Sequence, residues 1–271
     1  MNEVLLLALA MLLAGGVAGV LAGLFGIGGG VIIVPVMEVA LAFFGVDTAI
    51  RMHIAVATSL AIIIPTSIAS SRAHHKHGAV DIDLVKRWAL LVLVGSLAGT
   101  YIASSLHGRT LSGIFAVFAL AIAAKLIFHA SDKVIGSEVP RGPAIATIPF
   151  GIGALSSMLG IGGGTISVMV FTLFGQPIHR AVGTAALFGL VISLPGTLGF
   201  MVLGWGDERL PAFMVGYVSI VGFALVAPMT VLAAPLGARI AHGMSQRALG
   251  VAFGTFLVIA SARMFYQTFQ G

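Results

Sequence analysis

Apolar runs of up to membrane-spanning length follow one another along almost the whole chain. They cover residues 4–25, 31–44, 54–71, 88–106, 111–128, 143–159, 165–174, 181–203, 212–238 and 248–266. A helix needs about 20 residues to cross the hydrocarbon core of a bilayer, and several of the runs reach that length. Charged residues make up 8% of the chain, whereas soluble domains carry roughly 25%. We therefore predict an all-α polytopic membrane protein.

The polar stretches between the runs are too short to form a separate soluble domain. The functional residues are therefore expected in or near the bilayer. The chain has no cysteine, which excludes disulfides and thiolate chemistry. Its formal net charge of +5 is explained by the positive-inside rule and by anionic lipid headgroups, so no nucleic-acid partner is predicted.

The first apolar run has no basic residue before it, and the first Lys or Arg of the chain is Arg51. A cleaved signal peptide carries a basic segment ahead of its apolar core, so this run is predicted to be a retained membrane segment. The missing basic flank also predicts that the N-terminus faces away from the cytoplasm.

The sequence Gly-Ile-Gly-Gly-Gly occurs twice, at 26–30 and at 160–164, and each copy precedes an apolar run too short to cross a bilayer alone. One interpretation is close packing of small residues between helices. The other is a broken helix that restarts after the glycines and turns unpaired N–H groups and a positive dipole end toward an anion. Two copies in equivalent places favour the second interpretation, because paired breaks in two halves of a transporter mark its binding site.

The duplication extends beyond the glycines. Residues 53–58 align with 179–184, and matches between 99–125 and 237–263 share one constant offset. We therefore predict two structural repeats with helices broken at the glycine motifs. The first membrane repeat covers residues 1–135 and the second covers 136–271.

Each repeat contains four or five hydrophobic segments, and this number decides the relative orientation of the repeats. Four crossings, with each broken pair counted as one, predict parallel repeats. Five crossings place most Lys and Arg residues on one side, with Arg51, Arg109 and Arg209 near the other. The positive-inside rule favours five crossings, and hence inverted repeats with both termini outside.

Candidate substrate-binding groups are the glycine backbones and the hydroxyls of the second duplicated element. Hydroxyls inside a helix often bond only the carbonyl one turn back, which is the alternative for these side chains. If they approach the glycine breaks, they supply further hydrogen-bond donors to an anion. The predicted set is Gly28, Gly29, Gly30, Thr58, Ser59, Gly162, Gly163, Gly164 and Thr184.

Ionisable residues near the membrane form a second group of candidates. Glu38 lies inside a short apolar run, and an intramembrane acid is costly and commonly functional, so it is a candidate for proton coupling. Basic side chains just before two helices are candidates for attracting an anion to the mouth of the protein, or for setting topology. They are Arg51, His53, His179 and Arg180.

The two glycine motifs, each followed by an Ala-Val-x-Thr element, make the chain resemble the sulfite exporter TauE/SafE family. The resemblance covers about residues 10–265. It implies a multi-spanning permease for small sulfur-containing anions or organic acids, such as sulfite, thiosulfate or an organosulfonate. Ala185 departs from the pattern, because the first half has Ser59 at this place.

These observations predict a secondary transporter of a bacterial-type cytoplasmic (inner) membrane. Its partners would be a small anionic substrate and the lipid bilayer, and a homo-oligomer is compatible with the sequence. Coupling to protons or to the membrane potential is expected, and neither a cofactor nor a metal is predicted. The histidines at 74, 75 and 77 have no acid at ligand spacing, so we interpret them as part of a solvated loop.

Two other functions use the same residues. A passive anion channel needs the same dipoles and hydroxyls without alternating access. An intramembrane serine hydrolase needs Ser156 or Ser157 within hydrogen-bond reach of His179. The prediction of a transporter is therefore also a prediction that the protein is not an enzyme.

Overall fold

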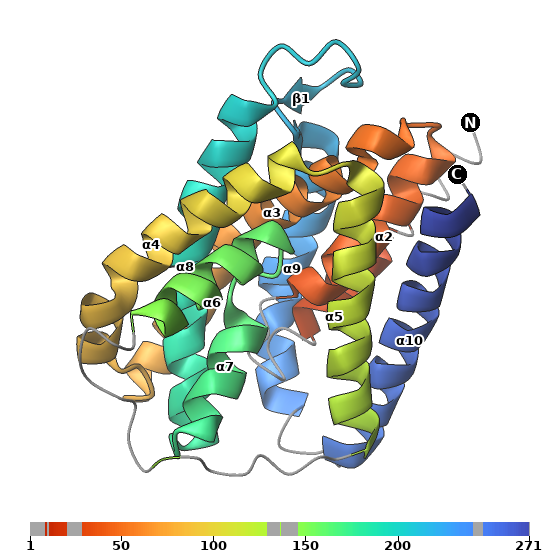
Figure 1. Ribbon diagram of the computed structural model, residues 1–271. Helices are drawn as coiled ribbons and strands as arrows, with labels where there is room; N and C mark the ends of the chain where they lie inside the picture. Colours follow the sequence, from red (N-terminus) through yellow and green to blue (C-terminus); the bar gives the residue numbers. More distant parts are fainter. Residues whose placement is uncertain are drawn as a thin grey trace.

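The chain forms a bundle of helices, which confirms the predicted all-α membrane architecture (Figure 1). The computed structural model describes residues 9, 11–20, 29–128, 136, 146–240 and 246–270. A short helix at Met11–Val20 comes first. It is followed by α2 (Gly30–Phe43), α3 (Thr48–Lys76), α4 (Ile82–Ser105), α5 (Gly108–Phe128), α6 (Thr147–Met158), α7 (Gly164–Leu173), α8 (Ile178–Leu203), the hairpin β1 (Met214–Val215) and β2 (Val218–Ser219), α9 (Ile220–Ile240) and α10 (Gln246–Gln270).

Five helices in the described part of the chain are long and apolar enough to cross a membrane: α3, α4, α5, α8 and the Ile220–Gly237 part of α9. The remaining described helices contain shorter apolar segments, including α2 and α7, which follow the two glycine motifs. Several separate spans make this a multi-pass membrane protein.

Helix ends differ from the apolar runs where polar residues cap or extend a helix. The run at 54–71 becomes the longer helix α3, because the Asp47 side chain accepts the Ala49 N–H at 2.9 Å and starts the helix at Thr48. The run at 212–238 begins instead with the β1–β2 hairpin, in which Met214 pairs with Ser219. Hydrophobicity alone does not distinguish these residues from the helix that follows.

Glycines let two pairs of helices touch backbone to backbone. A Cβ atom on Gly99 of α4 would lie 2.1 Å from the carbonyl oxygen of Ala154 in α6. A Cβ atom on Gly237 of α9 would lie 2.0 Å from the carbonyl oxygen of Val20. Neither position has room for a side chain, so these contacts depend on glycine, as is common between helices in lipid.

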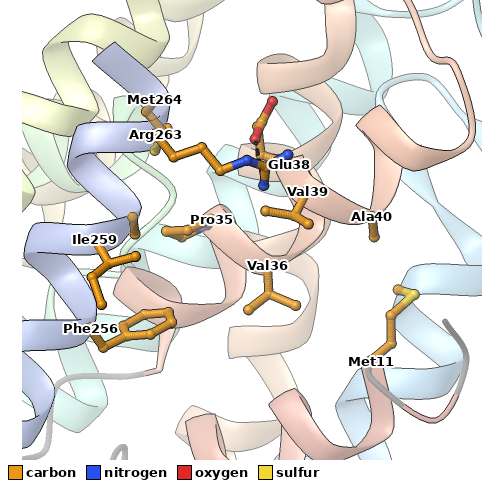
Figure 2. Close-up of a pocket in the computed structure, with 11 residues that line it drawn as sticks. Met11, Pro35, Val36, Glu38, Val39, Ala40, Phe256, Ile259, Arg263 and Met264 are labelled. Atoms are coloured by element: carbon orange, nitrogen blue, oxygen red, sulfur yellow. Dashed lines mark ion pairs between the residues drawn. The ribbon is translucent and has the colours of Figure 1, made fainter. Parts of the chain in front are cut away.

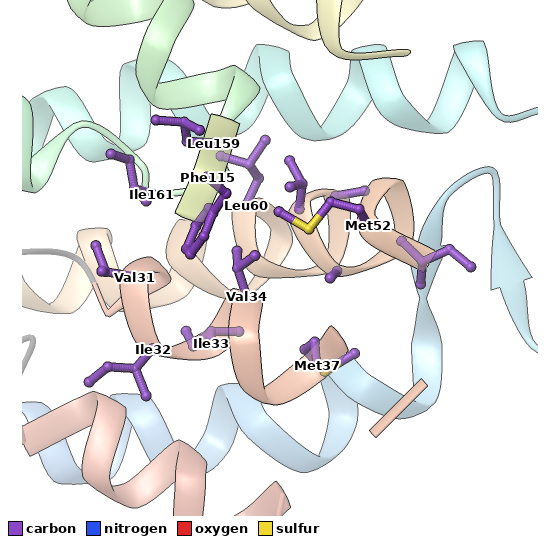
Figure 3. Packing of buried hydrophobic residues seen from close by; sticks show 14 of the residues in the cluster. Val31, Ile32, Ile33, Val34, Met37, Met52, Leu60, Phe115, Leu159 and Ile161 are labelled. Atoms are coloured by element: carbon purple, nitrogen blue, oxygen red, sulfur yellow. The ribbon is translucent and has the colours of Figure 1, made fainter. Parts of the chain in front are cut away.

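The interior around α2 is packed with aliphatic side chains. Figure 3 shows Val31, Val34 and Met37 of α2 in one cluster with Leu60 and Met52 of α3. All five side chains are almost completely buried. This dry packing holds α2 along α3, and thereby positions both ends of α2.

An ionic contact outside the spans organises the segment before β1. Arg209 donates two hydrogen bonds to Asp207, from Nε at 2.9 Å and from Nη2 at 2.7 Å, and Tyr217 Oη donates a third at 3.2 Å. The bonds from Arg209 are the main cause that lowers the pKa of Asp207 from 3.8 to about 2. The carboxylate is therefore ionised throughout the neutral range.

We predict that Gly99→Ala destabilises the fold by about 1–3 kcal/mol, the usual cost of overpacking, because its methyl group overlaps the Ala154 carbonyl. Thermal unfolding in detergent measures this change. Gly151→Ala in α6 is the matched control, since nothing lies within 4 Å of its Cβ position. Equal unfolding temperatures for the two variants would contradict the close contact between α4 and α6.

The Asp207 contact predicts a pH dependence confined to the hairpin segment. The lowered pKa means that the contact is complete above about pH 4 and is lost as pH falls through about 2. The protection factors of amides at residues 205–219, corrected for the intrinsic pH dependence of exchange, should therefore fall a few-fold in acid. Asp207→Asn should show this lower protection already at neutral pH, whereas Glu208→Gln, an exposed neighbour, should not.

Candidate functional site

The two glycine motifs, far apart in the sequence, lie against each other. Gly30 begins α2, and a Cβ atom there would lie 2.3 Å from the Gly160 carbonyl oxygen and 2.7 Å from the Ile161 Cα atom. We call Gly29, Gly30 and Gly160–Gly164 the glycine junction. Gly28 of the predicted set lies outside the described residues.

Helix α3 lies beside the glycine junction and holds it in place. Ser59 Oγ donates a hydrogen bond of 2.7 Å to the Gly160 carbonyl oxygen. Ile63, one turn further along, is the close neighbour of both Gly30 and Gly162. Of the predicted hydroxyls, Ser59 is thus the one that reaches the junction, where it bonds the chain itself.

The backbone of the junction turns toward α7 with unpaired donors. Gly163 precedes α7 with a φ of 78°, and a Cβ atom on it would lie 2.3 Å from Ile192 Cδ1. The first α7 bond runs from the Ser167 N–H to the Gly163 carbonyl at 2.9 Å. The N–H groups of residues 162–166 find no acceptor in the described part of the chain. Such a helix start favours an anion.

Buried hydroxyls near the junction also lack partners among the described residues. Ser156 of α6 and Ser167 of α7 are fully buried, and neither Oγ atom has a hydrogen-bond partner. The Ser156 Oγ lies 3.7 Å from the Cβ position of Gly163. Thr197 of α8 is a further buried hydroxyl without a partner. The sequence did not predict these three hydroxyls as binding groups. For Ser156 a signal was present, because it belongs to a pair of adjacent serines just before a glycine motif.

Thr58 and Thr184 hold the starts of other helices. The Thr58 Oγ1 accepts the Ser219 N–H at 2.9 Å, just before α9. The Thr184 Oγ1 accepts the Asp81 N–H at 2.9 Å, just before α4. Each threonine therefore anchors a distant helix start, and its predicted role toward a substrate stays a prediction.

The basic candidates occupy different places. His53 is buried, and its Nε2 lies 3.1 Å from the carbonyl oxygens of Ala103 and Leu106. His179 and Arg180 are exposed at the start of α8, where Arg180 pairs with Asp81 at 3.0 Å. The structure does not bring His53 together with His179 and Arg180. The role of these residues in anion attraction stays a prediction.

Glu38 and Arg51 form a buried ion pair near the end of α2. Arg51 Nη1 lies 3.2 Å from Glu38 Oε1, and their side chains are 12% and 5% exposed. Figure 2 shows Arg263 of α10 extending toward the same carboxylate, with Nη1 at 3.9 Å from Oε2. Glu38 and Arg263 lie at one end of a cavity of about 220 Å³ with otherwise apolar walls. Glu38 is thus a buried carboxylate between two guanidinium groups.

The structure does not bring Ser156 or Ser157 into hydrogen-bond contact with His179. Ser157 Oγ lies 2.6 Å from Thr100 Oγ1, and both serines before the glycines are fully buried. His179 is exposed and makes no hydrogen bond with either of them. Within the described residues there is also no group of three or more His, Asp or Glu side chains that could hold a metal.

A multi-spanning helical bundle in which two glycine-led helix starts meet in the interior is typical of polytopic membrane transporters. The model of the sulfite exporter TauE/SafE family matches residues 11–264. The chain belongs to this family, as its glycine motifs had indicated.

Similar proteins share nearly the whole length of the chain. A protein described as a probable membrane transporter from Haemophilus influenzae is 31% identical over 256 residues, covering 94% of this chain and 96% of the relative. One with the same description from Methanocaldococcus jannaschii is 27% identical over 259 residues, covering 94% of each chain. A third, from Bacillus subtilis, is 24% identical, covering 95% of this chain and 97% of the relative. The family and these descriptions agree on a membrane transporter.

The buried ion pair predicts a non-additive effect of its two residues. Arg51→Gln should destabilise the protein by about 3 kcal/mol, because it leaves the Glu38 charge buried without its main partner. The double variant Glu38→Gln/Arg51→Gln should lose less than the single Arg51 variant. Unfolding in detergent measures all members of this cycle, and additive losses would show that the two side chains do not interact.

Proposed function

We propose that the protein is a secondary transporter for a small sulfur-containing anion, such as sulfite, thiosulfate or an organosulfonate. The observation that carries the proposal is the row of unpaired N–H groups at the start of α7, inside the glycine junction. Buried donors with no acceptor are costly, and an anion would satisfy several of them at once.

The side chains around the junction support an anion as the ligand. Ser156 is a neutral hydrogen-bond donor without a partner among the described residues, whereas the Ser59 hydroxyl is donated to the Gly160 carbonyl; Ile63 and Ile192 are apolar. A compact oxyanion is bound well by dipoles and hydroxyls at one helix start. The choice of sulfur-containing anions comes from the family to which the chain belongs.

Inverted repeats are part of this proposal. Two reciprocal hydrogen bonds support the duplication itself, and the positive-inside rule supports the inverted orientation. Thr58 and Thr184 are equivalent under the duplication, and each accepts the N–H of the residue before a long helix of the other predicted repeat. These two residues, Ser219 and Asp81, each cap their own helix by accepting an N–H three residues on. Halves related in this way, at 1–135 and 136–271, suit alternating access to a shared central site.

The transporter would operate in a bacterial-type cytoplasmic membrane and use protons or the membrane potential. Glu38 is the proposed proton carrier, because it is a buried carboxyl whose Oε2 has no hydrogen-bond partner. Its two arginine neighbours hold the carboxylate at one defined place. Protein purified into lipid would also show whether the working unit is a homo-oligomer.

Flux of labelled sulfite, thiosulfate and a sulfonate into proteoliposomes tests the proposal. We expect saturable flux of one of these anions, accelerated by an imposed pH gradient or potential, above an empty-liposome control. Rapid, non-saturating flux without coupling would favour a passive channel. No flux of any of them by folded, inserted protein would overturn the proposed substrate class.

Substitution of the unpartnered serines tests the proposed site. Ser156→Ala and Ser167→Ala should each raise the half-saturating anion concentration about tenfold, because a hydrogen bond to a charged group contributes roughly 1.5–3 kcal/mol. Ser104→Ala is the control, since its hydroxyl bonds the Tyr101 carbonyl on the outside of α4. Unchanged kinetics in both test variants would place the anion elsewhere.

A further inference from the structure

The cavity beside Glu38 lies between three helices that each pack on a different neighbour. Its walls come from the Met11–Val20 helix, α2 and α10, and its volume is about 220 Å³. Close glycine contacts join the first of these helices to α9 and α10 to α5, whereas α2 packs along α3. Figure 2 shows Phe256 and Ile259 of α10 across the cavity from Val36 of α2. The space between α2 and α10 is therefore left unfilled by side chains.

The walls of this cavity suit a hydrocarbon chain. Apart from Glu38 and Arg263, every lining side chain is apolar. Val39 and Ile259 are 41% and 65% exposed, so the cavity opens to the outside of the bundle, where a membrane protein meets lipid. Apolar cavities of about 150 Å³ in proteins already bind a molecule as large as benzene. An acyl chain that enters from the bilayer would give the cavity walls the van der Waals contacts that an empty space cannot.

Among the described residues, the charged end of the cavity has one unsatisfied group of each sign. Glu38 Oε2 is buried and has no hydrogen-bond partner. Arg51 does not supply one, because its guanidinium bonds Glu38 Oε1 and the Val46 carbonyl. Arg263 Nη1 lies 3.9 Å from Oε2, too far for a hydrogen bond, and the Arg263 side chain is 39% exposed. The carboxylate therefore lacks a donor, and the neighbouring guanidinium lacks an acceptor.

This charged end lies near the surface of the bilayer. Glu38 is five residues before the end of α2 at Phe43, and Arg263 is seven before the end of α10 at Gln270. Tyr266, one turn beyond Arg263, is 62% exposed, and tyrosines are enriched where a membrane meets water. The apolar walls lie further from these helix ends. The cavity thus presents charge at headgroup depth and apolar surface below it, the same order of groups as in a lipid.

We propose that this cavity binds a membrane phospholipid with a primary-amine headgroup, namely phosphatidylethanolamine. One acyl chain fills the space between α2 and α10. The lipid phosphate accepts hydrogen bonds from the Arg263 guanidinium, and the lipid ammonium donates one to Glu38 Oε2. A choline headgroup has no N–H to donate, and a glycerol headgroup brings no positive charge to the carboxylate. The ethanolamine headgroup satisfies both groups together.

The bound lipid would connect parts of the protein that otherwise touch little. It joins α2, in the first predicted repeat, to α10, in the second. Helix α2 begins at Gly30 in the glycine junction, so a lipid held against its other end helps to fix the position of the whole helix. Lipid binding itself does not rest on the proposed transport, and it is measured without any flux.

Native mass spectrometry of the detergent-purified full chain tests the inference. The probes are phosphatidylethanolamine, phosphatidylcholine and phosphatidylglycerol with identical acyl chains. We expect the ethanolamine lipid to bind about tenfold tighter than either of the others, the effect of one hydrogen bond between charged groups. Equal binding of the three lipids, or tighter binding of either of the other two, would overturn the inference on the unaltered protein.

Two substitutions test the headgroup contacts. Arg263→Gln should weaken binding of all three lipids about tenfold, because each carries a phosphate. Glu38→Gln should remove the preference for the ethanolamine lipid. Arg109→Gln is the matched control and should bind as the wild type does, since Arg109 is exposed at the start of α5, beside the start of α3, and does not line this cavity. Wild-type binding in Arg263→Gln, or a preference that persists in Glu38→Gln, would overturn the inference.

A pair of substitutions on α10 tests the place of the acyl chain. Ala260 lines the cavity, so Ala260→Phe should fill it and weaken binding of all three lipids about tenfold. Ala262→Phe is the matched control, because Ala262 is exposed on the same helix and does not line the cavity. Unfolding temperatures measured without lipid establish that both variants are folded. Equal lipid binding by the two folded variants would overturn the inference.

Discussion

In a lipid environment, backbone donors and acceptors must find partners within the protein, because the hydrocarbon offers none. This chain meets the requirement with helices almost everywhere, and interrupts them at the glycine junction. There Gly30 lies on the Gly160 carbonyl, and Ser59 satisfies that carbonyl from α3. The N–H groups entering α7 find no acceptor among the described residues, and they form the proposed anion site. The short helices, the close packing around them and the location of the site all follow from that one interruption.

The helical architecture was predictable because apolar length and the glycine motifs are local properties of the sequence. The break before α7 at Gly163 and the one before α2 at Gly29 lie where the motifs placed them. Predicted boundaries were displaced where polar residues matter, as at Asp47, whose side chain starts α3 ahead of the apolar run. The hairpin before α9 was missed because its residues are as apolar as those of a helix.

The site was less predictable, because its contacts join residues that are distant in the sequence. Thr58 was predicted as a substrate ligand from its repeated motif, but its hydroxyl accepts the N–H of Ser219, 161 residues away. Ser156 was considered only as a nucleophile, and its value as an unpartnered donor becomes visible only with the packing around Gly163. The pairing of Glu38 with Arg51 depends on the turn between α2 and α3, and neither residue has a pattern that indicates the other.

The glycine contacts between helices also have a consequence for how the chain is made. The face of α4 that carries Gly99 emerges from the ribosome before α6, which it packs against. The Met11–Val20 helix is synthesised well before its partner at Gly237, which belongs to α9. Insertion of the spans and their packing are therefore separate stages. Until α9 is in place the nascent protein presents bare backbone grooves to lipid, and these are the surfaces that a membrane chaperone or quality-control protease would encounter.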